Sequence, residues 1–401
     1  LYTQKTKGVV PSLIDGLYNE RVFNRKQYVE YKKQLAKLTV DTDEYKECKA
    51  KMERADTIQH VIKILLNSIY GVFANKFSPI CDSDHAGSIT LTGQSVVKQA
   101  SDIIDQYAKE KLGYEGKSLT IYNDTDSTHV TIQPILDKMG LNIYSGTKIN
   151  AEGLKFIDDE LGVYLNTKIK EWAAQSLNST DPRYFFKRES ICDVAVYLEK
   201  KRYIIHVLND EGADVNKFKY VGVEIARSTT PKKAKELIKK VIENSLLAQD
   251  QNKSNTIYRD VFNTFKGLTI DDIAIRGGLS DLEKYEGKAD GFKIGKGTPN
   301  HVKGALWYNY LLKHRDLETK YERITSGGKV KKIYIAPNKY NIDTLCYIGS
   351  YPPEFSDFEV DYQEMFDTII KPPVEAVYTA LNWQLPRVNN EAQTDLFELF
   401  S

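Results

Sequence analysis

Apolar and polar residues alternate on both sides of a short acidic segment near residue 125. The alternating apolar positions are Leu119, Ile121, Val130 and Ile132. This pattern predicts two strands joined in a hairpin. Asp124 and Asp126 stand between them, and side chains two residues apart on extended backbone project to one side. We therefore expect both carboxylates to face one point.

A helical pattern covers Ser12 to Lys37. Pro11 precedes Ser12, and Asp15 follows three residues later, which is typical of a capping box. Arg21 and Arg25 are four residues apart and share one face of this helix. The solvated face of any charged helix would show the same pattern.

A second helix is predicted from Asp56 to about Tyr70. Lys63, Asn67 and Tyr70 share one face of it at ~100° per residue. An apolar face for packing lies opposite and comprises Ile58, Val61, Leu65 and Ile69. An ordinary amphipathic helix explains the apolar face equally well. It does not explain why Lys63, Asn67 and Tyr70 share the opposite face. A lysine can neutralise phosphate, an asparagine can donate to its oxygens, and a tyrosine can pack on a base or sugar.

Length and composition place the chain among globular proteins. The 401 residues predict about two to three domains. With 41% hydrophobic and 28% charged residues and no apolar run of ~18, the chain has no expected membrane span. The four cysteines form no zinc motif or disulfide framework, which indicates a reducing compartment. A net charge of +1 does not by itself indicate nucleic-acid binding, so any such function depends on local clusters of positive charge.

Two local groups carry candidate chemistry. Paired carboxylates at Asp124 and Asp126 suit a divalent metal and phosphate chemistry, although Asp and Thr are also common in exposed turns. Lys200, Lys201 and Arg202 precede a strand-like run that begins at Tyr203. A sheet could present these cations to DNA phosphates without reading sequence. An ordinary solvated cluster is the alternative.

Two motifs in order resemble family B DNA polymerases. Lys63-x3-Asn67-Ser68-x-Tyr70-Gly71 resembles the fingers motif that binds the incoming dNTP. About 50 residues later, residues 122–127 resemble the palm motif, which usually reads Tyr-Gly-Asp-Thr-Asp-Ser. Asn123 replaces the usual glycine, and asparagine tolerates positive φ better than most residues. Further matches extend the resemblance to the myovirus-type phage branch.

The resemblance implies an α+β fold with fingers, palm and thumb, the palm having an antiparallel sheet backed by helices and the fingers being helical. We expect fingers at 1–75, palm at 76–250 and thumb at 251–401. The segment from Gly8 to Arg21 resembles the start of the fingers, which implies Arg21, Arg25 and Lys63 around the triphosphate, with Asn67 and Tyr70.

Other matches imply DNA contacts. Residues 199–203 resemble the Lys-Lys-Arg-Tyr motif that contacts the primer terminus, which implies DNA binding by Lys200, Lys201, Arg202 and Tyr203. Glu189 matches a nearby palm carboxylate, and residues 222–231 resemble the end of the palm. Residues 299–304 resemble a thumb segment that grips duplex DNA, which implies His301 and Lys303.

The implied reaction is two-metal nucleotidyl transfer from dNTP to a primer 3′-hydroxyl on primer-template DNA. Asp126 would be the main metal ligand and Asp124 auxiliary, with two Mg2+ ions, or Mn2+ in their place. The family's first palm motif has an aspartate upstream of the fingers, and residues 1–10 contain no acid. We therefore expect a split or truncated polymerase with little or no activity alone. An N-terminal subunit would supply that aspartate and the exonuclease.

The C-terminal tail resembles sliding-clamp-binding peptides at Gln393, Leu396, Leu399 and Phe400. A terminal helix packed on its own domain is the alternative. The expected location is the cytoplasm of a phage-infected host cell. Two other functions stay open: a non-catalytic DNA- or clamp-binding scaffold derived from a polymerase, and an unrelated metal-dependent phosphotransferase, which would need the ordered motifs by chance.

Overall fold

A computed structural model describes residues 6–35, 37–141, 144–145, 148–179, 183–286 and 297–389. The chain divides into two compact units. Unit 1 comprises Leu1–Leu141 and Asp159–Phe186, and unit 2 comprises Asn142–Asp158 and Lys187–Ser401. The expected fingers belong to unit 1, and the expected thumb belongs to unit 2. The expected palm is divided between them: residues 76–141 and 159–186 belong to unit 1, and residues 142–158 and 187–250 belong to unit 2. The mixture of helices with small antiparallel sheets confirms the α+β class.

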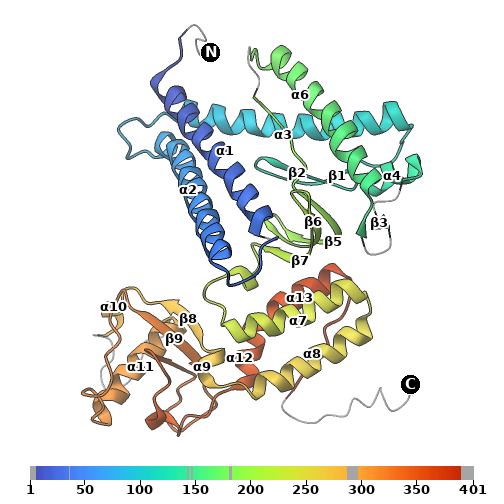
Figure 1. Cartoon of the computed structure of the whole chain (residues 1–401). Coiled ribbons are helices and arrows are strands. Elements are labelled where there is room, and N and C mark those ends of the chain that lie inside the picture. Colours follow the sequence, from blue (N-terminus) through green and yellow to red (C-terminus); the bar gives the residue numbers. More distant parts are fainter. Residues whose placement is uncertain are drawn as a thin grey trace. The chain divides into compact units, whose positions relative to one another are not determined.

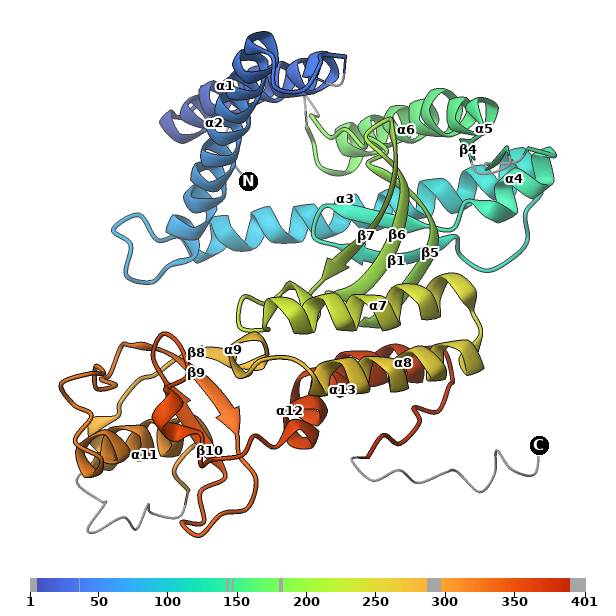
Figure 2. The same cartoon turned by 60° about the horizontal axis from the view of Figure 1, so that its bottom comes forward.

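Two long helices, α1 (Val9–Leu35) and α2 (Asp43–Ala74), lie side by side in unit 1 (Figures 1 and 2). Partly or fully buried positions recur along both at alternating spacings of four and three residues. In α1 they are Leu17, Arg21, Asn24, Tyr28, Tyr31 and Leu35, and in α2 Cys48, Met52, Ala55, Gln59, Ile62, Leu66, Ile69 and Phe73. This spacing is typical of a coiled coil. We call the two sets the seam.

The structure corrects three details of these helices. Ser12 does not cap α1, because the helix begins at Val9 and the Ser12 hydroxyl donates to the Gly8 carbonyl oxygen (2.8 Å). Helix α2 begins at Asp43, well before the predicted start, because the Thr42 side chain accepts from a backbone N–H of its first turn. The predicted packing face is wrong in part: Val61 and Leu65 are 57% and 47% exposed, whereas Ile58 and Ile69 are partly buried.

The rest of unit 1 surrounds a third long helix, α3 (Ser83–Leu112). Asp82 caps its start by accepting from two backbone N–H groups, and Gly113 ends it at a φ of 59°. Helix α3 contacts the hairpin of β1 (Thr120–Asp124) and β2 (Ser127–Val130), α4 (Gln133–Met139) and α6 (Gly162–Ser176). The carboxylate of Asp105 in α3 also accepts from the Leu119 backbone N–H (2.8 Å). The predicted hairpin is therefore confirmed, and it lies against α3.

Unit 2 contains a three-stranded antiparallel sheet of β5 (Ser190–Glu199), β6 (Arg202–Asp210) and β7 (Ala213–Val221) in that order. Helix α7 (Lys232–Ala248) packs on α8 (Gln251–Lys266) and α13 (Lys371–Ala380), and α13 contacts β5. Val196 and Ile204 of the sheet share one buried cluster with the α7 residues Ile238 and Val241. The expected strand after Arg202 and an antiparallel sheet backed by helices are thus present.

A second three-stranded sheet in unit 2 has the order β10-β9-β8. Its strands are β8 (Ile275–Gly278), β9 (Lys329–Tyr334) and β10 (Thr344–Tyr347). Helix α11 (Asn300–His314) packs on β10 and α12 (Tyr362–Ile369) on β9. The remaining elements are β3 (Tyr144–Ser145), β4 (Lys148–Ile149), α5 (Ala151–Lys155), the π-helix η1 (Phe156–Leu161), the 3-10 helices η2 (Glu224–Ala226) and η4 (Pro353–Phe355), α9 (Ile270–Ile273) and α10 (Glu283–Glu286).

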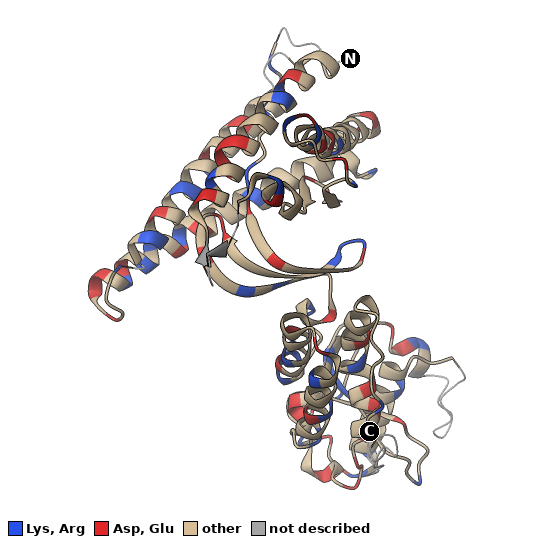
Figure 3. Ribbon diagram, turned by 90° about the vertical axis from the view of Figure 1, so that its right-hand side faces the viewer, with Lys and Arg blue, Asp and Glu red and all other residues tan. Residues whose placement is uncertain are grey.

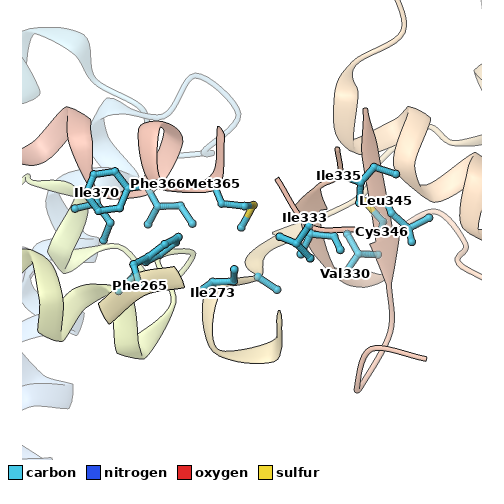
Figure 4. Close-up of a cluster of buried hydrophobic side chains, with 14 of the residues drawn as sticks. Phe265, Ile273, Val330, Ile333, Ile335, Leu345, Cys346, Met365, Phe366 and Ile370 are labelled. Atoms are coloured by element: carbon cyan, nitrogen blue, oxygen red, sulfur yellow. The ribbon is translucent and has the colours of Figure 1, made fainter. Parts of the chain in front are cut away.

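An aromatic cluster joins α8 to α12 in the core of unit 2 (Figure 4). The Phe366 ring is fully buried, and its centroid lies 4.9 Å from that of Phe262 and 5.5 Å from that of Phe265. Both contacts are edge-to-face or nearly so, the arrangement that aromatic rings favour. Ile333 and Leu345 of the neighbouring sheet belong to the same buried cluster. One core thus connects the helices to the β8-β9-β10 sheet.

Charges of both signs are distributed along the helices of the two units (Figure 3). This mixture agrees with the net charge of +1. In the described part of the chain, no helix is both long and apolar enough to cross a membrane.

The cysteines differ sharply in burial, and we expect their reactivity to follow. Cys81 is exposed, whereas Cys48 and Cys346 are buried and Cys192 is intermediate. Burial raises the pKa of the Cys346 thiol to about 12 and that of Cys192 to about 11. Iodoacetamide attacks the thiolate, so at pH 8 it should label Cys81 first in the native protein. Mass spectrometry after a short pulse checks this, with Cys81→Ser as the control. Labelling of Cys346 as fast as Cys81 would contradict the packing described.

Candidate active site and nucleic-acid contacts

The acidic turn between β1 and β2 is a tight two-residue loop. Asp124 ends β1 and pairs with Ser127, so Thr125 and Asp126 form the loop. The Asp126 backbone N–H donates to the Asp124 carbonyl oxygen (2.6 Å), and Thr125 between them has a φ of 56°. A bond that closes over one residue at positive φ is typical of the strained form of the γ-turn. Positive φ is unfavourable for a β-branched residue, and such strain is concentrated at functional sites.

This geometry corrects the premise that Asp124 and Asp126 lie on extended backbone. Asp124 is half-buried, and its Oδ1 accepts from the Thr125 hydroxyl (2.9 Å). The Ser127 hydroxyl donates to the Asp124 carbonyl oxygen (3.1 Å). Asp126 is exposed at the loop. The turn therefore orients one carboxylate and projects the other into solvent.

Asn123 occupies a strand position, and the left-handed residue of the motif is Thr125. The Asn123 amide nitrogen donates to the Ser101 hydroxyl of α3 (3.2 Å), and Ser101 is buried. The replacement of the usual glycine thus needs no unusual backbone here. Its side chain instead ties β1 to α3.

The two carboxylates of the turn fit a hard divalent cation in part. Mg2+ is commonly held by one or two carboxylates, with waters and substrate phosphates completing its shell. Among the described residues, no group of three or more His, Cys, Asp or Glu side chains is arranged to hold a metal ion. Asp124 and Asp126 by themselves do not make up such a group.

The predicted dNTP-binding row on α2 is exposed. Lys63, Asn67 and Tyr70 are all exposed, and each directly follows a seam position, namely Ile62, Leu66 and Ile69. On α1, Arg25 is exposed, whereas Arg21 is in the seam and is half-buried. The Nε atom of Arg21 is buried with no hydrogen-bond partner in the described part of the chain. Because α1 packs on α2, the structure brings these cations onto one helical pair within unit 1.

The Lys-Lys-Arg-Tyr motif forms the turn between β5 and β6 in unit 2. Lys200 and Lys201 are exposed in this turn. The Arg202 guanidinium forms ion pairs with the carboxylates of Glu199 and Glu224. Tyr203 is buried, with its ring centroid 5.7 Å from that of Tyr197. Glu224 is 22 positions from Arg202, so no local pattern in the sequence indicated this contact.

The remaining candidates are dispersed in unit 2. Glu189 precedes β5, is exposed, and has its Oε1 4.0 Å from the Lys219 Nζ. His301 is exposed on the first turn of α11, and Lys303 is half-buried. The tail residues Gln393, Leu396, Leu399 and Phe400 lie outside the described residues.

Comparisons with known proteins agree with the motifs. Residues 2–145 match the family model DNA polymerase family B. The chain is 25% identical to the DNA-directed DNA polymerase of Escherichia phage RB69 over 84% of this chain and 38% of that protein. It is also 25% identical to the DNA-directed DNA polymerase of Enterobacteria phage T4, over 65% of this chain and 30% of that protein.

A cellular relative matches a similar share of the chain. DNA polymerase 1 of Sulfolobus acidocaldarius is 25% identical over 78% of this chain and 31% of that protein. The chain thus spans well under half the length of these relatives. The family match and the two phage relatives confirm the resemblance seen in the motifs: the chain is a relative of the family B DNA polymerases of the myovirus type.

Proposed function

We propose that this chain supplies the fingers, most of the palm and the thumb of a DNA-directed DNA polymerase. The observation that carries the proposal is the presence of two motifs in one compact unit. The strained Asp124–Asp126 turn and the exposed row of Lys63, Asn67 and Tyr70 both belong to unit 1. Their order and spacing resemble those of family B DNA polymerases, and the model of that family matches residues 2–145.

In this proposal Asp126 is the main ligand for a divalent cation, and Asp124 is auxiliary. Mg2+ fits this oxygen set, and Mn2+ is an alternative. When bound, two such ions lower the barrier to nucleotidyl transfer by neutralising charge on the reacting oxygens. The role of the protein is to hold the exposed Asp126 carboxylate in a turn whose backbone is fixed against α3.

The helical pair would bind the triphosphate of an incoming dNTP. Lys63 acts as a point charge, and Arg21 and Arg25 add planar donors that suit phosphate. Asn67 donates to a phosphate oxygen, and the Tyr70 ring packs against the base or sugar. All five side chains belong to α1 and α2 in unit 1.

Unit 2 would bind the primer-template duplex. The turn of Lys200 and Lys201, with Arg202 and Tyr203 at the start of β6, contacts the primer strand, and His301 and Lys303 of α11 contact the duplex. Contacts of this kind attach to phosphates and do not read sequence. Glu189, just before β5, is proposed as a further palm carboxylate.

Complete activity would need carboxylates from polypeptide outside these 401 residues, in the same chain or in a separate N-terminal subunit that also carries the exonuclease. In this proposal Asp124 and Asp126 are only a partial set of ligands, since among the described residues no three or more His, Cys, Asp or Glu side chains are grouped to hold a metal ion. Binding of a sliding clamp by residues 393–400 belongs to the same proposal. The partial set also keeps a non-catalytic scaffold as the second candidate, and metal-dependent synthesis in the presence of the missing segment discriminates the two.

Replacing Lys63 with methionine should weaken dNTP binding about 10- to 100-fold, because a hydrogen bond to a charged group is worth about 1.5–3 kcal/mol. Lys63 is exposed, so the fold should not change. Equilibrium titration of the chain with dNTP and Mg2+ measures the effect. Lys51→Met on the same helix is the matched control, because the Lys51 Nζ lies 2.6 Å from Glu47. Equal losses in both variants would argue against a triphosphate site at Lys63.

A further inference from the structure

We infer that Glu224 is a positioning residue that fixes the Lys200–Lys201 turn through Arg202. The two lysines then meet the DNA backbone, and the Arg202 guanidinium serves the turn rather than a phosphate. This inference deepens the proposed function and rests on it. Four features of unit 2 carry it: the shape of the turn, the contacts of Arg202, the anchorage of Glu224, and the close approach of Gly222.

The turn is closed tightly and exposes both lysines. Glu199 and Arg202 are paired across β5 and β6, so Lys200 and Lys201 form a two-residue loop. Lys201 has a φ of 63°, in the left-handed region that is unfavourable for a residue with a side chain. A turn that needs such a conformation persists only where its surroundings hold it.

Arg202 makes its contacts to carboxylates of the protein. Its Nη2 donates to both carboxylate oxygens of Glu224 (2.9 and 3.0 Å), and its Nη1 donates to Glu199 Oε2 (3.2 Å). The side chains of Arg202 and Glu224 are only 28% and 23% exposed. The Arg202 Nε is buried as well. Because both terminal nitrogens of the guanidinium already donate to carboxylates, few of its N–H groups are left to bind a phosphate.

Glu224 is anchored to the core of unit 2. It begins the 3-10 helix η2, and the flanking residues Val223 and Ile225 are 2% and 4% exposed. The Thr230 hydroxyl donates to the Glu224 carbonyl oxygen (2.8 Å). The Arg227 Nη2 also lies 3.3 Å from Glu224 Oε1. The carboxylate that holds Arg202 therefore moves little relative to the core.

Gly222 lets the base of the turn approach this anchor. It has a φ of 66°, and a Cβ there would lie 2.0 Å from the Lys201 carbonyl oxygen and 3.1 Å from the Arg202 Cγ. No side chain fits at that distance. The backbone of Lys201 thus rests directly on Gly222, while Arg202 reaches past it to Glu224. Both contacts hold the same turn.

The direction in which Glu224→Gln changes DNA affinity distinguishes a positioning role of Glu224 from a purely electrostatic effect of its charge. Glu224→Gln removes a negative charge near the proposed DNA surface and releases Arg202, so electrostatics alone would strengthen DNA binding. If Glu224 positions the turn, the same substitution should weaken binding about 3- to 10-fold, the range of a disrupted cooperative pair. Fluorescence anisotropy of a labelled primer-template with the full chain measures this. Glu236→Gln on α7 is the control, because Glu236 forms an exposed ion pair with Lys233 (3.4 Å).

The Lys200→Met, Lys201→Met double variant shows whether Glu224 acts through the lysines. In that background Glu224→Gln should cause no further loss of DNA binding. Unchanged or tighter binding by Glu224→Gln alone would overturn the inference. An equal loss in both backgrounds would also overturn it, because Glu224 would then act on the fold in general. A wild-type chain that does not bind primer-template would refute DNA binding in the proposed function and this inference with it.

Discussion

Asp126→Asn is expected to reduce nucleotide incorporation at least about 1000-fold, because the loss of a metal-binding carboxylate removes several kcal/mol of transition-state stabilisation. The substitution keeps the size of the side chain and removes only its charge. Asp126 is exposed in its turn, so the free energy of unfolding should change by less than about 0.5 kcal/mol. Single-turnover incorporation, in the presence of the proposed N-terminal polypeptide, measures the loss.

Asp137→Asn is the matched control for this substitution. Asp137 is an exposed aspartate of α4 in the same unit, and its Oδ1 accepts from the Gln133 amide (2.6 Å). It should keep incorporation within about twofold, as expected of a surface change. If Asp126→Asn retained a tenth of the wild-type rate while Asp137→Asn lost none, Asp126 would not be a metal ligand in the reaction.

Phe366→Ala should lower the free energy of unfolding of unit 2 by about 3–5 kcal/mol, the usual cost of removing a large core ring. The ring is fully buried and touches the aromatic rings of Tyr258, Phe262 and Phe265 in α8. Figure 4 shows Phe366 beside Phe265. Its removal leaves a cavity where α12 packs on α8. Urea unfolding followed by intrinsic fluorescence measures the change.

An exposed phenylalanine provides the comparison. Phe185 is 70% exposed, so Phe185→Ala should change the unfolding free energy by less than about 0.5 kcal/mol. A loss below about 1 kcal/mol for Phe366→Ala would mean that α12 does not pack on α8 as described, since even a well-relaxed core truncation costs more than that.

Local patterns predicted the hairpin and the existence of both long helices, because apolar alternation and helical periodicity are properties of adjacent residues. They were wrong in part about which side of α2 is buried: Ile58 and Ile69 are partly buried, but Val61 and Leu65 are exposed. Val61 and Leu65 form one plausible stripe and Ala55 and Ile62 another, and the partner helix α1 decides between them. Tertiary packing against α1 determines which face of α2 is buried, and the spacing of residues within α2 does not reveal that packing.

The carboxylate turn was predicted in place but not in shape. An extended backbone was the simplest reading of Asp124 and Asp126, since a threonine is a poor candidate for positive φ. The structure has Thr125 at a φ of 56°. Likewise the pairing of Arg202 with Glu224 joins positions 22 apart and depends on how η2 folds back beside β6. Strained backbone and long-range ion pairs are the features that local sequence patterns predict least well.

If this chain forms part of a template-directed polymerase, the template base must determine which nucleotide is added. The most direct test is primer extension with Mg2+, in which the chain is mixed with the polypeptide encoded immediately upstream and the next template base is each of the four in turn. We expect addition of the complementary nucleotide in every case, and no addition when Asp126→Asn replaces the wild type. Incorporation that ignores the template base, or that survives Asp126→Asn unchanged, would contradict it.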